Sequence, residues 1–211
     1  MAETGLLARW KIDVSEARSY PRHIKTDAGE IEFRLMSRAD EAAVHSFAKR
    51  LPTHDLLFLP RNISEPKVLS AWINEIERGA ITSLLAVKDG EVVGCGALVR
   101  DLHSWSPHVG EIRMVVSIDV RGQGVGRALS QETFALALGT GLEKLSVQMT
   151  VDQRAAIALF ESLGFKAEAL LRDHVRDVDG KAHDIVVLGH NIPQFAAQLE
   201  AFGVPEAVQQ S

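Results

Sequence analysis

Apolar and polar residues alternate in short blocks along most of the chain, and this pattern predicts strands and helices in turn. Strict alternation over 31–35 is typical of a strand with one buried face. Apolar residues spaced three and four apart, bounded by Ser, Pro or Gly, indicate the helices. The expected strands are 31–35, 81–87, 91–102, 111–116, 145–149, 165–172 and 185–188. The expected helices are about 38–51, 66–78, 126–138 and 153–163.

The order of these elements predicts a mixed sheet. Asp89-Gly90 between two strand patterns is a strong hairpin signal, and Asp179-Gly180 is a second turn. The strand, helix and strand between residues 109 and 149 should instead form a right-handed parallel crossover. Gly94 and Gly96 indicate a bulge or a close approach of another element to their strand.

Composition limits the class of protein. The chain has 211 residues, 46% apolar and 24% charged, with a net charge of −5, which fits one domain with extensions and offers no basic stripe for nucleic acid. A single cysteine, Cys95, excludes an internal disulfide and a cysteine-rich zinc site. No apolar run approaches the roughly 20 residues of a membrane span, so no membrane partner and a cytoplasmic location are expected. Residues 1–30 are expected to be an N-terminal extension, and 192–211 a C-terminal helical extension. The first of these alternates like a short strand near Trp10–Val14, and is either an extra strand or an arm that covers a neighbour.

A glycine-rich segment follows the apolar run Met114-Val115-Val116. Gly122, Gly124 and Gly126 precede helical spacing, and a strand that enters a helix through such a turn presents free amides to an anion. The alternative is a tight turn that binds nothing. A P-loop is excluded because Arg127-Ala128 stands where Lys-Ser/Thr is needed, and the dinucleotide fingerprint lacks its last glycine.

Two motifs give the chain a family resemblance. Arg121-Gly122-Gln123-Gly124-Val125-Gly126 fits the pattern Arg/Gln-x-x-Gly-x-Gly/Ala, and 156–165 (Ala-Ile-Ala-Leu-Phe-Glu-Ser-Leu-Gly-Phe) resembles the second cofactor motif of the GNAT superfamily of acyl-CoA-dependent N-acetyltransferases. The resemblance implies an α/β (mixed α+β) fold over 31–191. Its central twisted sheet would be mostly antiparallel, with six to seven strands, about four flanking helices and a splay between the fourth and fifth strands.

The resemblance also implies acetyl-CoA as cosubstrate and a set of contacts for it. The pantetheine arm would pair with the backbone of Met114, Val115 and Val116, and the pyrophosphate would rest on the amides of 121–127. The second motif adds two positions, Gln153 and Phe160. The implied cofactor-binding residues are Met114, Val115, Val116, Arg121, Gly122, Gln123, Gly124, Val125, Gly126, Arg127, Gln153 and Phe160.

Catalysis is expected to involve Glu111 as general base, because it lies on the same strand just before the cofactor contacts. The alternative is a solvated glutamate or a partner for Arg113. Phe160 occupies the position at which the family usually has a tyrosine that acts as general acid, and a phenylalanine has no proton to donate. Two functions therefore remain. One is an N-acetyltransferase that acts by direct attack of an amine. The other is a catalytically weak acyl-CoA-binding regulatory module.

The acceptor is expected to be a primary amine of a small molecule, amino acid or peptide. In the family its site is shaped by the loop at about 52–64, here with Asp55, Leu57 and Phe58, and by the last hairpin at about 171–183. Carboxylates of that hairpin would suit a cationic acceptor, although solvated turns are also rich in them. No metal site is expected, since the histidines show no compact ligand spacing. The resemblance is compatible with a homodimer.

Overall fold

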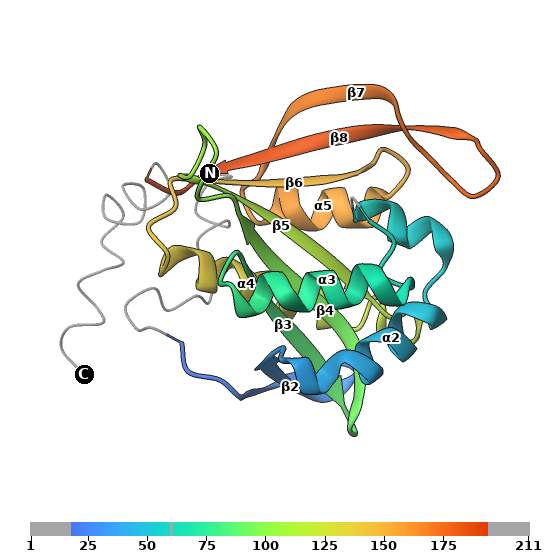
Figure 1. Cartoon of the computed structure of the whole chain (residues 1–211), viewed down its shortest axis with the longest axis vertical. Coiled ribbons are helices and arrows are strands. Elements are labelled where there is room, and N and C mark those ends of the chain that lie inside the picture. Colours follow the sequence, from blue (N-terminus) through green and yellow to red (C-terminus); the bar gives the residue numbers. More distant parts are fainter. Residues whose placement is uncertain (1–17, 60, 194–211) are drawn as a thin grey trace, which may run out of the picture.

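The computed structural model describes residues 18–59 and 61–193. The strand expected near Trp10–Val14 lies outside these ranges, as does the C-terminal helix beyond Pro193. Within the described ranges the chain forms one mixed sheet of eight strands in the order β1-β2-β3-β4-β5-β6-β8-β7 (Figure 1). The strands are β1 (Arg22–Thr26), β2 (Gly29–Leu35), β3 (Ile81–Lys88), β4 (Glu91–Arg100), β5 (Val109–Val116), β6 (Lys144–Thr150), β7 (Lys166–Arg176) and β8 (Ala182–Asn191).

The expected mixed α/β fold is confirmed, with one strand more than the six to seven expected. Neighbouring strands are antiparallel except β5 and β6, which are parallel and joined by a helical crossover. The additional strand, β1, comes from the segment expected as an extension and pairs with β2 at the sheet edge. Its sequence, RHIKT, is mostly exposed and carries little apolar periodicity.

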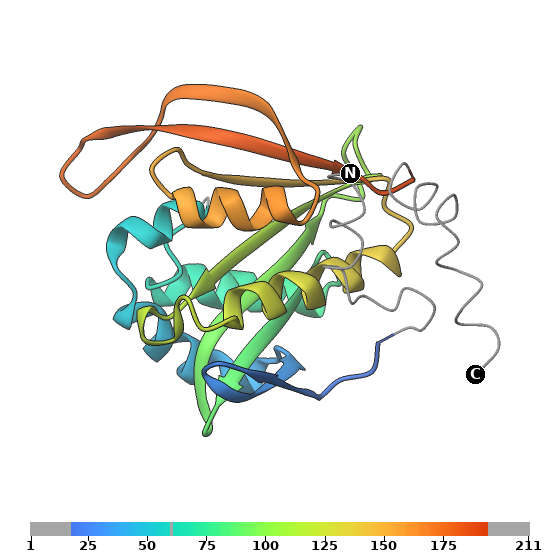
Figure 2. The same ribbon diagram turned by 180° about the vertical axis from the view of Figure 1, so that it is seen from behind.

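Helices cover both faces of the sheet. The helices α4 (Val125–Leu138) and α5 (Arg154–Ser162) lie on the face seen in Figure 2, while α2 (Glu41–Arg50) and α3 (Pro66–Glu77) lie on the face seen in Figure 1. Three short 3₁₀ helices complete the description: η1 (Arg38–Asp40), η2 (Thr53–Phe58) and η3 (Ile118–Val120). No helix in the described ranges is both long enough and apolar enough to span a membrane.

Local sequence signals explain two features that shape the sheet. Asp89 and Gly90 both have positive φ (50° and 83°), as a two-residue hairpin turn requires, and they join β3 to β4. Gly94 and Gly96 let α4 pack closely on β4, since a Cβ at either position would lie 3.2 Å from Leu129. Close packing is therefore one role of these glycines. A bulge also lies beside them, because the register passes from Val87–Val92 to Ala86–Gly94 and leaves Val93 of β4 as the extra residue.

The segment before β1 is fixed to α4 by a buried carboxylate. Glu132 is 2% exposed and accepts a hydrogen bond from Tyr20 Oη at 3.0 Å. Arg18 forms an ion pair with the same carboxylate, and Arg22 Nε lies 3.5 Å from it. Burial, followed by the Glu132 charge, raises the pKa of Tyr20 above its usual value. The only tyrosine of the chain therefore serves as an anchor.

Candidate active site

The sheet splits between β5 and β6. The two strands pair only over Val109–Glu111 and Lys144–Ser146, whereas β5 stays paired with β4 up to Val116 and β6 with β8 up to Thr150. Glu111 is thus the last β5 residue paired with β6. A small pocket opens in the split, lined by Ile112, Arg113, Met114, Val147, Gln148, Met149, Ala156 and Phe160. The splay expected between the fourth and fifth strands of the core is present.

Backbone groups of β5 point into this split at every second residue. The amide of Ser117 donates to Val93 O on the β4 side at 2.8 Å. Because backbone groups alternate between the two edges of a strand, those of Val116, Met114 and Ile112 face the split. Val115, also expected as a cofactor contact, directs its backbone toward β4 and buries its side chain in the core at 4% exposure.

The glycine-rich loop ends at the start of α4. Gly122 and Gly124 have φ of 71° and 85°, the left-handed region that glycine adopts without strain. The first helical bond runs from Ala128 N to Gly124 O at 3.0 Å, so the amides of 125–127 have no acceptor within the helix. Together with the helix dipole they favour an anion at this end of α4. Asp27 N donates to Gln123 O at 3.1 Å, which fixes the loop to the β1–β2 turn.

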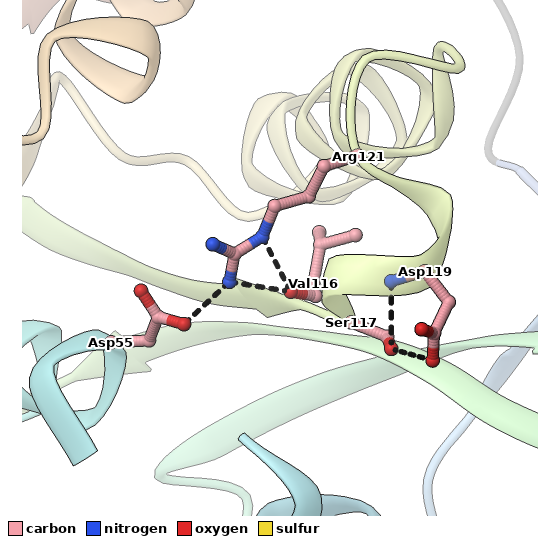
Figure 3. Close-up of polar contacts among 5 residues, drawn as sticks. All are labelled: Asp55, Val116, Ser117, Asp119 and Arg121. Carbon is pink, nitrogen blue, oxygen red and sulfur yellow. Dashed lines mark hydrogen bonds and ion pairs between the residues drawn. The ribbon is translucent and has the colours of Figure 1, made fainter. Parts of the chain in front are cut away.

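The side chain of Arg121 connects three segments at the open end of the split. Figure 3 shows its guanidinium between Val116 O, at 3.0 Å from Nη2, and the Asp55 carboxylate of η2, at 2.6 Å. In the same view Ser117 accepts from Asp119 N and closes η3. Among the acceptor-side residues expected from the loop at 52–64, Asp55 therefore supports the glycine loop. The side chain of Phe58 lies outside the described part of the chain.

The second motif places one polar and one apolar side chain beside the split. Gln153 is the N-cap of α5. Its Oε1 accepts from Thr150 N at 3.1 Å, and its Nε2 is buried with no hydrogen-bond partner among the described residues. An orphaned buried amide needs an acceptor, and this one, with the glycine loop, fits an acyl-CoA. Phe160 is 4% exposed and packs edge-on against Phe165 at 5.2 Å.

Glu111 is held by its neighbour on the same face of β5. Arg113 Nε and Nη2 each donate to one oxygen of the Glu111 carboxylate, both at 2.9 Å. Both side chains are about one quarter exposed (22% and 23%), so the pair remains accessible to substrate and water. The prediction of a partner in Arg113 is confirmed by this geometry, and a base at Glu111 would have to act from within the pair.

A larger pocket lies on the α3 face and shares Arg113 with the split. Four arginines line it against two carboxylates, Glu75 and Asp101. Arg78 pairs with Glu75 at 2.8 Å and Arg113 pairs with Glu111, which leaves Arg61 and Arg100, opposed by Asp101, to give the pocket its positive character. His103 also lines this pocket.

Other candidate groups are placed away from the split or are occupied. Cys95 is 1% exposed, and burial raises the pKa of its thiol to about 12, so it is no nucleophile. In the last hairpin Asp177 pairs with His183 and Asp184 accepts from Asp173 N, so these carboxylates serve the hairpin itself. Sequence reasoning missed one cluster: His54, Asp152 and His183 converge from three segments.

Comparison with known proteins agrees with this geometry. The model of the Acetyltransferase (GNAT) family matches residues 43–165. An N-alpha-acetyltransferase 30 from Schizosaccharomyces pombe is 24% identical over 123 residues, which is 57% of this chain and 82% of that protein. An IAA acetyltransferase from Azospirillum brasilense is 37% identical over 86 residues, and there the match spans 40% of this chain and only 54% of the relative.

The fold also matches solved structures. One is an acetyltransferase from Salmonella typhimurium determined with its cofactor acetyl-CoA. It superposes with a TM-score of 0.65 at 20% identity, over 77% of this chain and 94% of the other. At this identity the likeness shows the fold.

Proposed function

Because the chain belongs to the GNAT acetyltransferase family, we propose that it transfers an acetyl group from acetyl-CoA to a primary amine of a small molecule, amino acid or peptide. One observation carries the proposal: the split between β5 and β6 begins directly after Glu111 and leads to the glycine loop. This order, with Glu111 first, the split next and the glycine loop last, supports a reacting centre, a slot for the pantetheine arm and an anion site along one strand.

The residues for acetyl-CoA follow from this arrangement. The amides of 122–127 would hold the pyrophosphate, and the slot-facing backbone of Met114 and Val116 would bind the pantetheine amides. Val116 O already accepts from Arg121, so the cosubstrate would share or displace that bond. Gln153 Nε2, buried and without a partner among the described residues, would donate to a pantetheine oxygen.

The transfer needs a proton to leave the amine and another to reach the sulfur. The amine nitrogen bonds to the thioester carbon, the carbon–sulfur bond breaks, and Glu111 accepts the amine proton directly or through water. Arg113 orients the carboxylate and places its positive charge beside the slot. Phe160 gives no proton, and the polar side chains lining the slot are Arg113 and Gln148. The departing thiolate would therefore take its proton from solvent.

The acceptor would enter from the α3 face through the arginine-lined pocket. Its positive character favours an amine that also carries a carboxylate, such as an amino acid. A cationic polyamine would meet Arg61 and Arg100 unfavourably.

A thiol-release assay with acetyl-CoA and matched amines tests the proposal. The panel pairs amino acids with their carboxamides and adds polyamines and short peptides with free N-termini. We expect turnover for the free amino acids, with kcat/KM at least tenfold above that of the carboxamides. Glu111→Gln should lower kcat/KM by about 10²- to 10⁴-fold, while the exposed Glu161→Gln should leave it unchanged.

The absent tyrosine favours one alternative, an acyl-CoA-binding regulatory module. That function predicts saturable binding of acetyl-CoA with no turnover of any amine. It also predicts that Glu111→Gln has no effect in the thiol-release assay. If only the carboxamides and polyamines are acetylated, the protein is a transferase, but the proposal that its acceptor carries a carboxylate is wrong.

A further inference from the structure

Three segments far apart in the sequence bring metal-ligand side chains together at the open end of the split. His54 lies on η2, Asp152 follows β6, and His183 lies at the start of β8. One donor atom from each of these residues lies within 4.8 Å of the other two. Two imidazoles and one carboxylate are a donor set typical of divalent transition metals.

The contact between His54 and Asp152 is close without being a hydrogen bond. His54 Nε2 lies 2.9 Å from Asp152 Oδ2, yet this buried nitrogen has no hydrogen-bond partner among the described residues. The ring of His54 also meets that of His183 edge-on at 5.2 Å. The convergence of three donor atoms, one of them a buried ring nitrogen, is the arrangement that a shared ion would satisfy.

A second carboxylate orients His183. Its Nε2 lies 2.7 Å from Asp177 Oδ2, which leaves Nδ1 on the opposite side of the ring for a ligand. The other Asp177 oxygen accepts from the amides of Asp179 and Lys181 at 3.0 and 2.9 Å, so the carboxylate is itself fixed by the hairpin turn. Carboxylate–histidine–metal arrangements use such an outer partner to set the tautomer and the ring direction.

The cluster is separate from the reacting centre. Glu111 is level with Ser146 on β6, and Asp152 follows the strand's last residue, Thr150. The four residue steps from Ser146 to Thr150 span about 13 Å of strand, beyond direct proton transfer. An accessible path exists, because the Asp152 side chain is 56% exposed and that of His54 is 35% exposed.

We infer that His54, Asp152 and His183 bind one Zn²⁺ ion, with water as the fourth ligand and Asp177 as the outer partner of His183. Neighbouring ligand atoms of a tetrahedral zinc lie about 3.3 Å apart, so the farthest donor would move inward by about 1.5 Å. The ion would join η2 to the β7–β8 hairpin across the mouth of the split. The inference does not depend on acetyl transfer.

Titration of the tag-free protein with ZnCl₂, followed by calorimetry, tests the site. We expect one ion per chain with a Kd of micromolar or tighter, and an increase in melting temperature with Zn²⁺. His54→Gln and His183→Gln should each weaken binding at least tenfold, and Asp177→Asn about tenfold through its outer-shell role. His174→Gln, which changes an exposed histidine of the same hairpin, should bind as the unaltered protein does.

Cobalt gives a readout independent of activity and of stability. Co²⁺ bound to this donor set should show the strong visible absorption of a four-coordinate ion, and Zn²⁺ should displace it. Circular dichroism of each variant without metal verifies its fold. Absence of stoichiometric binding by the unaltered protein, or binding that folded His183→Gln retains in full, overturns the inference.

Discussion

At the scale of single residues, the Glu111–Arg113 pair makes a prediction about coupling. Two hydrogen bonds of 2.9 Å join these side chains, so neither should act alone. In a double-mutant cycle of Glu111→Gln and Arg113→Met, the effects on kcat/KM should be non-additive, with a coupling energy of about 0.5–3 kcal/mol. Additive losses would show that Arg113 serves the acceptor pocket independently of the carboxylate.

The glycine loop gives a second residue-scale prediction. Gly124→Val places a branched side chain at φ 85°, costs about 1–3 kcal/mol in strain and narrows the expected pyrophosphate site. We expect calorimetry to show at least tenfold weaker acetyl-CoA binding. Gly126→Ala is the matched control, because its Cβ would meet Val116 and Leu159 at an ordinary 3.8 and 3.9 Å. If both variants bind acetyl-CoA with equal affinity, the pyrophosphate does not bind at the glycine loop.

At the scale of elements, the segment before β1 should stabilise α4 through Glu132. This carboxylate is 2% exposed and interacts with Arg18, Tyr20 and Arg22. Because Glu132→Ala leaves the buried Arg18 guanidinium and the Tyr20 hydroxyl without their partner, we expect it to lower the free energy of unfolding by about 3–5 kcal/mol in urea titrations. Tyr20→Phe should cost about 1.5–3 kcal/mol.

The control for this anchor is Glu161→Ala on α5. Glu161 is exposed, so its replacement should change the free energy of unfolding by no more than about 0.5 kcal/mol. If Glu132→Ala is as mild as this control, the N-terminal segment contributes little to the stability of the sheet.

At the scale of the whole molecule, the sequence predicted what depends on local chemistry. The dipeptide Asp89-Gly90 favours a hairpin turn with positive φ through its own local chemistry. The alternation of side chains along a strand places Glu111 and Arg113 on the same face. Strand β1 was not predicted because its exposed, charged residues carry no pattern until β2 lies beside them. The meeting of His54 with Asp152 and His183 depends on the paths of three segments, and no spacing along the chain encodes it.

The stability of the whole domain should decrease in acid through His190. This residue is 5% exposed and packs between Phe134 and Phe165, at ring distances of 5.0 and 5.1 Å. Burial lowers its pKa from 6.5 to about 4. Between these values the unfolded chain binds a proton that the folded chain does not, so the free energy of unfolding falls as the pH falls.

The contribution of His190 is fully present above pH 6.5 and is lost down to about pH 4, for a total of about 3 kcal/mol. Urea unfolding of the unaltered protein and of His190→Phe, measured at steps from pH 7 to pH 4, isolates it from the other titrating groups. The difference in unfolding free energy between the two proteins should shift by about 3 kcal/mol in favour of the variant as the pH falls. His174→Phe, a change at an exposed position of the last hairpin, is the control and should follow the unaltered protein at every pH. A parallel pair of curves for the unaltered protein and His190→Phe would mean that the buried ring binds its proton in the folded state as readily as in the unfolded chain.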